Sequence, residues 1–266
     1  MRWLRTYRLL VAAAFSAEFQ YRGNLLINIA GGLFYQGVGL AFLWAVLERF
    51  GTIGGWGLDE ITFLYGMRLM AHSLWATPGN QLIYVDEVIV GGEYDRYLVR
   101  PAPPLVQLLA RRLRLTALGD LIGGVALLAF ASSRAPVDWS PAAAGYLVLA
   151  IIGGALVEGA LQLAACALAF TMKKTMPIRL TIDTVFNDFG NYPLKIFGSA
   201  ASFGLTFLFP LAFVAYLPAT MLLNREEELA VPSWLGWGAP AAGVLLMYAA
   251  YRFWVWQSRS YESSGH

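Results

Sequence analysis

Long apolar stretches constrain the fold of this 266-residue chain more than any other feature of its sequence. Five of them approach or exceed the roughly 20 apolar residues that cross a bilayer core about 30 Å thick. They lie at about residues 25–47, 60–78, 113–131, 142–170 and 237–256. Charged residues make up only 14% of the chain, whereas a soluble domain carries about 25%. We therefore predict an all-α integral membrane protein.

A sixth apolar segment, roughly residues 180–222, is too long for one straight crossing, and Pro210 and Pro218 interrupt its second half. Two full crossings here would give seven spans in total. One crossing at about 180–203, followed by a re-entrant external hairpin at 205–222, gives six. We favour six transmembrane helices, because the resulting placement of Lys and Arg residues is the more asymmetric one.

Lysine and arginine residues gather on one side of this six-span arrangement. Of the nineteen, fourteen share a side with the N-terminus, three lie on the opposite side, and Arg68 and Lys195 fall within spans. The fourteen are Arg2, Arg5, Arg8, Arg22, Arg96, Arg100, Arg111, Arg112, Arg114, Lys173, Lys174, Arg179, Arg252 and Arg259. Because cytoplasmic loops are enriched in these residues, we predict that both termini are cytoplasmic in a multi-pass protein of the bacterial cytoplasmic membrane.

The first 24 residues precede the first apolar span and carry arginines at every third position, Arg2, Arg5 and Arg8, among bulky apolar residues. This pattern favours an amphipathic helix, residues 1–24, that lies along the inner membrane surface. A cleaved signal peptide is the alternative, since the basic start and the short apolar run also fit one.

Motifs of nucleotide binding and hydrolysis are missing from the sequence. It contains neither a G-x-x-x-x-G-K-[ST] phosphate loop nor a G-x-S-x-G nucleophile motif. Cys166 is the single cysteine, and His72 and His266 have no partner at metal-ligand spacing. Every loop is short and no linker is evident. We therefore predict one domain over residues 1–266, with no catalytic residue, no metal site and no cofactor bound by this chain.

Ionisable residues inside predicted spans are candidates for a polar pathway, because an unpaired charge at membrane depth costs several kcal/mol. The candidate pathway residues are Arg68, Glu158, Asp183, Asp188 and Lys195. Glu158 is the strongest, since it lies near the middle of its apolar stretch. Structural pairing, or reaching toward the interface, is the alternative role for all five.

A dense polar segment, "GGEYDRYLVRPAPP" at residues 91–104, interrupts the apolar pattern after the second span. Two glycines permit a sharp break, and three prolines stiffen the exit. Tyrosine and arginine side chains are the groups that most often dominate protein interfaces. The segment falls on the predicted cytoplasmic side, within a loop over residues 79–112.

The surface helix, the six spans, the polar loop after the second span and the broken segment together resemble the permease subunits of type-2 ATP-binding-cassette (ABC) exporters. The motif "GEYDRYLVRP" at 92–101, "NYP" at 191–193 and "FPLAFVAYLPATML" at 209–222 resemble one branch of that family. In this family the second-to-third loop couples to the ATPase subunit. The resemblance implies that the coupling residues are Glu93, Tyr94, Asp95, Arg96, Tyr97, Arg100 and Pro101.

The resemblance also implies the partners. ATP and Mg²⁺ would bind a separate ABC ATPase, expected in two copies, and the second permease would be either this chain or a sister chain. The lipid bilayer is the remaining partner, and no nucleic acid is expected. Two other functions stay open at this stage. One is a secondary transporter or channel with an intramembrane acidic site, and the other is a lipid-modifying enzyme that uses Asp183 and Asp188.

Overall fold

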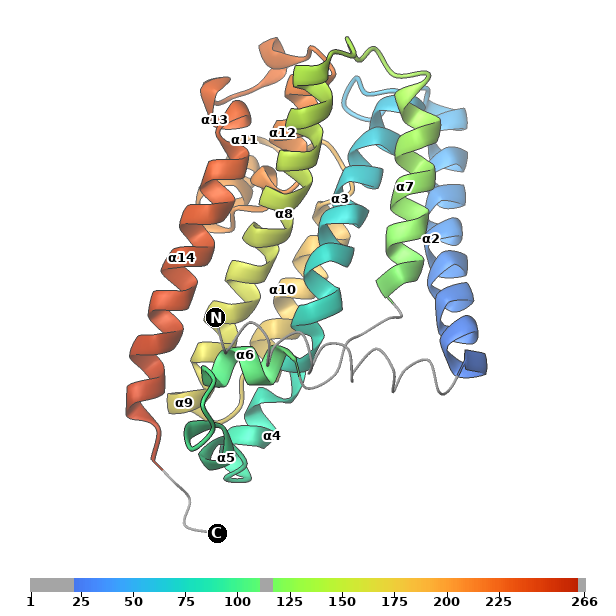
Figure 1. Cartoon of the computed structure of the whole chain (residues 1–266). Helices are drawn as coiled ribbons and strands as arrows, with labels where there is room; N and C mark the ends of the chain where they lie inside the picture. Colours follow the sequence, from blue (N-terminus) through green and yellow to red (C-terminus); the bar gives the residue numbers. More distant parts are fainter. Residues whose placement is uncertain (1–21, 111–116, 263–266) are drawn as a thin grey trace.

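The computed structural model describes residues 22–110 and 117–262, and the secondary structure of this part of the chain is helical (Figure 1). The one departure there is an isolated bridge between Ile53 and Trp56 in a tight turn. The all-α prediction is confirmed. The expected surface helix at 1–24 lies outside the described residues, apart from its last three.

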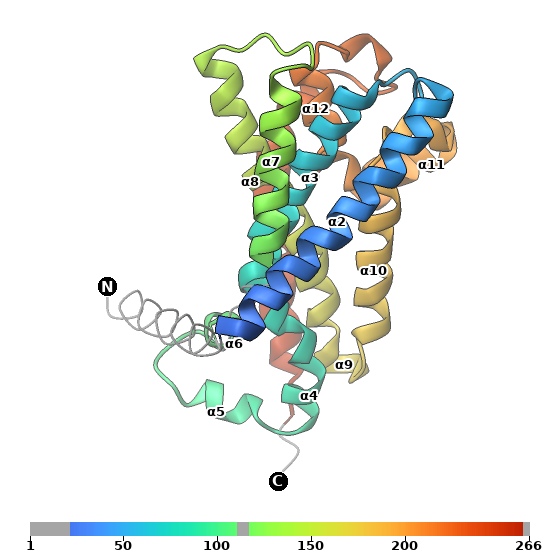
Figure 2. The same ribbon diagram turned by 90° about the vertical axis from the view of Figure 1, so that its right-hand side faces the viewer.

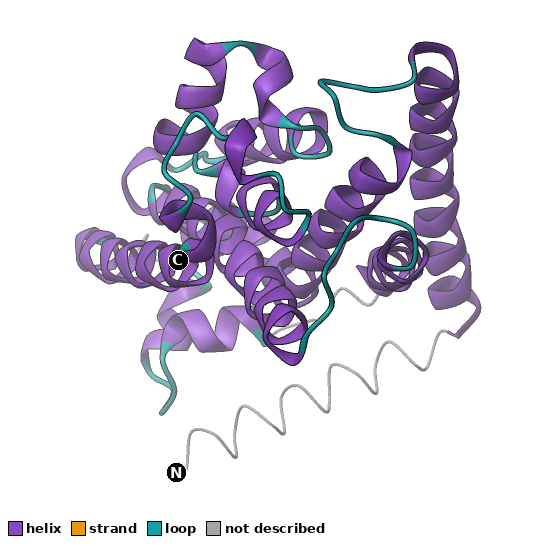
Figure 3. Ribbon diagram, turned by 90° about the horizontal axis from the view of Figure 1, so that it is seen from above, coloured by secondary structure: helices purple, strands orange, loops and turns teal. Residues whose placement is uncertain are grey.

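Six helices stand side by side and form the body of the molecule (Figure 1). They are α2 (Arg22–Phe50), α3 (Leu58–Gly79), α7 (Leu118–Ser132), α8 (Pro141–Ala167), α10 (Met176–Phe189) and α14 (Ala239–Gln257). The first residue of α2 and the last of α14 both lie toward the lower end in Figure 1. Helix α2 lies at the edge of the bundle and is strongly tilted, as the view from above makes plain (Figure 3).

Short helices close the two ends of this body. At the lower end are η1 (Asn80–Tyr84), α4 (Val85–Val90), α5 (Tyr94–Leu98), α6 (Pro104–Leu109), α9 (Ala169–Met172) and η7 (Ser258–Ser260). At the upper end are η3 (Leu194–Phe197), α11 (Ser199–Phe203), the π-helical η4 (Gly204–Leu208), η5 (Leu211–Phe213), α12 (Tyr216–Leu222), η6 (Glu226–Glu228) and α13 (Trp234–Trp237).

Among the described residues, two helical stretches are long and apolar enough to cross a membrane, Leu25–Phe50 and Pro141–Met172. A third candidate is the bent pair formed by Ser199–Leu208 and Leu211–Leu222. The expected count of six spans is not confirmed. The other upright helices are either short, such as α10, or carry charged residues, such as α3 with Asp59, Glu60 and Arg68.

The broken apolar segment differs from its prediction in one respect. A single crossing over 180–203 is wrong, because α10 ends at Phe189 and regular helix resumes only at Ser199. Pro193 cannot donate a backbone hydrogen bond and disfavours helix at the residue before it, and Gly198 adopts a positive φ of 80°. The second break falls at Pro210, where the two flanking helices meet at 76°. This geometry fits either a broken span or a re-entrant loop.

The core consists of two apolar clusters, one above the other. The upper cluster packs α3, α8 and the segment 211–223 around fully buried side chains such as Trp56 and Phe63. The lower cluster packs the loop helices α4 to α6 against α9 and the end of α14, around Tyr94, Phe170 and Trp254. The loop after α3 is therefore an integral part of the fold.

Helices α3 and α7 cross in close contact at two glycines. A Cβ atom on Gly124 would lie 2.8 Å from Cγ of Met70 and 3.2 Å from the carbonyl oxygen of Gly66. A Cβ atom on Gly66 would lie 3.0 Å from the backbone nitrogen of Leu128. Small residues that let helix backbones approach closely are a common packing device in membranes.

We expect Gly124→Val to destabilise the protein by about 1–3 kcal/mol, because the added methyl groups overpack the α3–α7 crossing. Thermal unfolding in detergent micelles measures this. Gly145→Val in α8 is the matched control, since nothing lies within 4 Å of a Cβ atom there. Equal stability of the two variants would contradict the close crossing.

Candidate functional site

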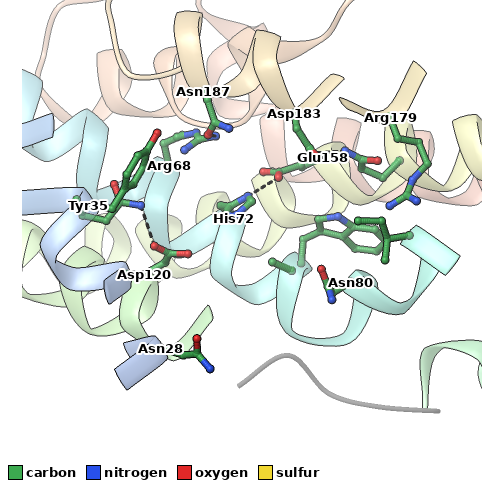
Figure 4. Close-up of a pocket in the computed structure, with 17 residues that line it drawn as sticks. Asn28, Tyr35, Arg68, His72, Asn80, Asp120, Glu158, Arg179, Asp183 and Asn187 are labelled. Carbon is green, nitrogen blue, oxygen red and sulfur yellow. Dashed lines mark hydrogen bonds and ion pairs between the residues drawn. The ribbon is translucent and has the colours of Figure 1, made fainter. Parts of the chain in front are cut away.

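A polar cavity of about 460 Å³ lies among α2, α3, α7, α8 and α10 (Figure 4). Amide side chains and an indole ring form part of its wall. Its ionisable lining residues, apart from a tyrosine, are Arg68, His72, Asp120, Glu158, Arg179 and Asp183. So many charged groups around one space are rare at membrane depth, which makes this cavity the candidate functional site.

Helical spacing explains why these side chains converge. Residues four apart lie on one face of a helix, and four of the wall helices place their cavity-lining residues, most of them polar, at this interval. The sets are Asn28, Gly32 and Gln36 on α2, Arg68 and His72 on α3, Glu158 and Gln162 on α8, and Arg179, Asp183 and Asn187 on α10. The cavity is thus the meeting point of four polar stripes on otherwise largely apolar helices.

An ion pair crosses the middle of the cavity. Nδ1 of His72 lies 2.5 Å from Oε1 of Glu158, whose side chain is only 1% exposed. Among the described residues of the cavity, this is the one close ion pair. Glu158 therefore faces the protein interior, as its position in an apolar stretch led us to expect.

Three of the other charged groups are held by the amide side chains of Gln and Asn residues. Gln36 donates to Oδ1 of Asp120 at 2.7 Å, and Gln162 donates to Oδ1 of Asp183 at 2.5 Å. Nη2 of Arg68 donates to Oδ1 of Asn187 at 2.8 Å, one turn of α10 beyond Asp183. Amide partners orient these charges without neutralising them, so both signs remain available to a polar ligand.

Of the five predicted pathway residues, Arg68, Glu158 and Asp183 line the cavity. Asp188 does not, because it lies one residue beyond the polar stripe of α10 and is exposed. Lys195 lies in η3, beyond the end of α10 at the upper end of the molecule, and bonds to Glu228. Neither residue lies on this cavity, and their place on a substrate pathway stays a prediction.

Sequence reasoning missed His72, Arg179 and the amide residues of the cavity. His72 was judged only as a metal ligand, and Arg179 only as a loop charge. The signal that identifies them is the four-residue interval: His72 follows Arg68 by one turn, and Arg179 precedes Asp183 by one turn.

The lower-end loop is built on tyrosines that point inward. Tyr94 is 2% exposed, and its ring centre lies 5.1 Å from that of Phe170 and 4.8 Å from that of Tyr261. Burial raises the pKa of Tyr94 to about 12, so its hydroxyl stays neutral at physiological pH. Tyr97 is also buried. Neither ring is free to fill a pocket on a partner, and the assignment of both residues to coupling stays a prediction.

The opposite side of this loop forms an exposed tip, residues 96–101. Val99 is 85% exposed and Leu98 is 54% exposed, and Arg96, Arg100 and Pro101 lie beside them in solvent. Glu93 and Asp95 are half-buried at its base. Gln107 holds the tip from behind, donating to the carbonyl oxygens of Tyr97 at 2.9 Å and Ala102 at 2.6 Å.

A charged cluster at the upper end, which we call the upper clasp, consists of Trp56, Glu60, Lys195, Arg225 and Glu228. Nε of Arg225 lies 2.6 Å from Oε1 of Glu60, and its Nη1 lies 2.5 Å from Oε1 of Glu228. The other carboxylate oxygen of Glu228 accepts from Lys195 at 2.6 Å and from Trp56 at 2.9 Å. The clasp ties the start of α3 to the segments on either side of α12.

Comparison with known proteins identifies the family. A family model described as "ABC-2 family transporter protein" matches residues 33–265, most of the chain. The chain belongs to the ABC-2 transporter family. No curated protein and no solved structure matches the chain.

Family membership confirms the resemblance and settles the class of function. ABC-2 permeases are membrane subunits that lack ATPase activity and work with ATPase subunits. This chain is therefore the membrane component of an ABC transporter rather than an enzyme. A secondary transporter, a channel and a lipid-modifying enzyme are left without support.

We expect the His72–Glu158 pair of this permease to be energetically coupled. His72→Leu and Glu158→Met each leave a buried polar partner alone, which is more costly than removing both. A double-mutant cycle on the free energy of unfolding in detergent should give a coupling of about 1–3 kcal/mol.

Glu158→Met combined with Arg134→Gln is the control cycle, because Arg134 is exposed at the upper end. The effects of this pair should add. Strict additivity of the His72 and Glu158 variants would contradict the pairing in the cavity.

The upper clasp predicts a loss of stability in acid. Partial burial of Glu228 opposes its ionisation, but the hydrogen bonds from Lys195 and Trp56 outweigh it, so the pKa of Glu228 lies below its ordinary value of 4.5. A lowered pKa means that the stabilisation is fully present above pH 4.5 and is lost as the pH falls through the lower folded-state value.

Melting temperatures of the ABC-2 chain between pH 7 and pH 3 test this expectation. The wild type should lose more stability below pH 4.5 than Glu228→Gln, which lacks the titrating group. Glu227→Gln, at an exposed neighbour, should behave as the wild type does. Parallel curves for the wild type and Glu228→Gln would count against the clasp.

Proposed function

We propose that this ABC-2 chain is the permease subunit of an exporter in the bacterial cytoplasmic membrane. It moves an unidentified polar substrate outward, driven by ATP and Mg²⁺ on a separate ATPase. Two ATPase copies serve a pair of permease chains. In this proposal the whole chain, residues 1–266, forms one permease domain. Within it we assign an interface helix to residues 1–24, the coupling loop to 79–112 and a re-entrant segment to 205–222.

The position of the cavity along the bundle carries this proposal. Most of its lining residues lie toward the lower ends of their helices: from the middle of α3 onward, in the second half of α8, and in the first half of α2 and α7. On α10 they extend from Arg179 in the first turn to Asn187 in the last. The distribution of Lys and Arg assigns the lower end to the cytoplasm. Above the cavity lie the upper core cluster and the upper clasp. A polar space near the cytoplasm beneath a closed outer end suits a permease that loads its substrate from inside.

A second permease chain completes the pathway in this proposal. Helix α2 crosses obliquely in front of α3 and α7, with α10 beside it (Figure 2), and the cavity lies between these elements. Its rim includes Tyr35, 70% exposed, and the exposed amides of Asn28 and Asn187. Polar groups at membrane depth are tolerated where protein or a water-filled space covers them, and a copy of this chain or a sister chain supplies that cover.

The ATPase docks on the exposed tip at residues 96–101. Tyr94 and Tyr97 anchor the tip from inside, and Glu93 and Asp95 support its base. Val99 and Leu98 offer apolar area, while Arg96 and Arg100 supply charge that fixes the register of the interface. All seven predicted coupling residues thus contribute to docking, some by direct contact and some by positioning.

Substitutions that change the charge of the exposed tip test this proposal. We expect Val99→Asp and Arg100→Glu to weaken ATPase binding at least tenfold, about 1.4 kcal/mol, because they replace contacts with a desolvated or repulsive charge. Detergent stability should stay near normal, since both side chains are exposed. The measurement is affinity capture of the ATPase by the tagged permease, with quantified recovery.

Arg134→Glu serves as the control, because Arg134 is exposed at the opposite end. It should recover as much ATPase as the wild type. Normal recovery with both tip variants would remove the docking role of this loop. Reproducible failure of the wild type to capture any ATPase would remove the ATP-driven mechanism itself.

A further inference from the structure

Asp86, in the first turn of α4, contacts the beginning of α10 although 90 residues of chain separate it from Met176. Its Oδ2 accepts hydrogen bonds from the backbone nitrogens of Thr175 at 2.6 Å and Met176 at 3.1 Å. Its Oδ1 accepts from the hydroxyl of Thr175 at 2.6 Å. One carboxylate thus binds three donors of a distant element.

Asp86 caps the N-terminus of α10, a role that the residue at the start of a helix usually performs. The first backbone N–H groups of a helix have no partner within it, and the N-cap side chain normally accepts from them. Thr175 is the N-cap residue of α10, yet its side chain makes no such bond. The Asp86 carboxylate binds there instead, where the helix dipole also favours a negative charge.

Two further contacts join the lower-end loop to the same region. Nη1 of Arg179, one turn into α10, donates to the carbonyl oxygen of Leu82 at 2.8 Å. Leu82 is fully buried in η1, directly before α4. The ring of Tyr94 packs on Phe170 of α9, the helix that precedes α10. The exposed tip and the start of α10 are therefore parts of one connected structure.

Helix α10 extends from this junction into the wall of the cavity. Asp183 and Asn187 follow Arg179 at four-residue intervals and contact Gln162 and Arg68. Much of the opposite face of α10 is exposed, including Leu180, Thr181 and Thr184. Polar contacts hold the start of α10 and its cavity face, while Ile182 and Phe186 are buried in the upper core cluster. The contact with α4 lies at the N-terminus of α10, so a displacement of α4 acts on α10 at that end.

We infer that Asp86 is a positioning residue that transmits movement of the coupling loop to α10, and so to the substrate cavity. This inference rests on the proposed function, because the movement originates in the ATPase. Asp86 contacts no substrate in this account. It acts through the N-terminus of α10.

Amide hydrogen exchange of the full permease–ATPase complex in nanodiscs tests the inference, comparing the nucleotide-free state with the state trapped by ATP and vanadate. In the wild type, exchange in residues 176–189 should change between the two states. In Asp86→Ala this nucleotide-dependent difference should fall at least threefold. ATPase capture, ATP hydrolysis and the exchange difference in residues 91–104 should persist in this variant. A variant that failed to fold would lose all three.

Three variants complete the test. Glu87→Ala is the matched control, since Glu87 is the adjacent acid on α4 and is exposed, and it should retain the difference in α10. Thr175→Val removes only the hydroxyl donor and should partially lower the nucleotide-dependent exchange difference in α10. If Asp86→Ala fails to fold, the result with Thr175→Val tests the inference in its place. Thr175→Ser keeps every donor and should match the wild type.

The inference is overturned if Asp86→Ala and Thr175→Val keep the full nucleotide-dependent difference in α10. If instead the wild-type permease captures no ATPase, the proposed function itself is wrong, and the inference fails with it. The two results are distinguishable, because the first occurs with the ATPase bound.

Discussion

The high free energy of a charge at membrane depth is the constraint on which the rest of this structure depends. Each charged side chain among the packed helices needs a polar neighbour, and the neighbours lie on other helices. His72 binds Glu158 from α3 to α8, Arg68 reaches Asn187 on α10, and Gln36 on α2 reaches Asp120 on α7. These bonds gather five helices around one polar space. The same groups that stabilise the bundle thus form its candidate pathway.

Polar contacts also decide which parts of the molecule move together. The body of α3 and α8 is packed through glycines and buried apolar side chains, a dense arrangement that resists deformation. Helix α10 adds to such packing, through Ile182 and Phe186, a set of polar contacts made by Asp86, Arg179, Asp183 and Asn187. A hydrogen bond can exchange with water at small net cost, whereas a packed interface cannot. These polar contacts support the proposal that the lower-end loop displaces one wall of the cavity through the start of α10.

Much of this was predictable from the sequence, because apolar length and charge act locally along the chain. The upright helices other than α10 fall close to the expected apolar stretches, and the bend lies at Pro210. Arg68, Glu158 and Asp183 were identified by their setting alone. The break after Phe189 and the inward turn of Tyr94 depend on tertiary packing that no local pattern specifies. His72 and Glu158 are 86 residues apart, so their pairing emerges only from the fold.

Access to the cavity from each side of the membrane is the most direct measure of the central claim, that ATP binding closes a cytoplasm-facing polar pathway. Tyr35→Cys places a thiol on the rim of the cavity, and the native Cys166 is fully buried. An impermeant thiol reagent is added to either side of proteoliposomes that contain the permease and its ATPase. The account predicts rapid labelling from the cytoplasmic side without nucleotide and protection from that side after trapping with ATP and vanadate. Equal labelling from the cytoplasmic side in both states would contradict it.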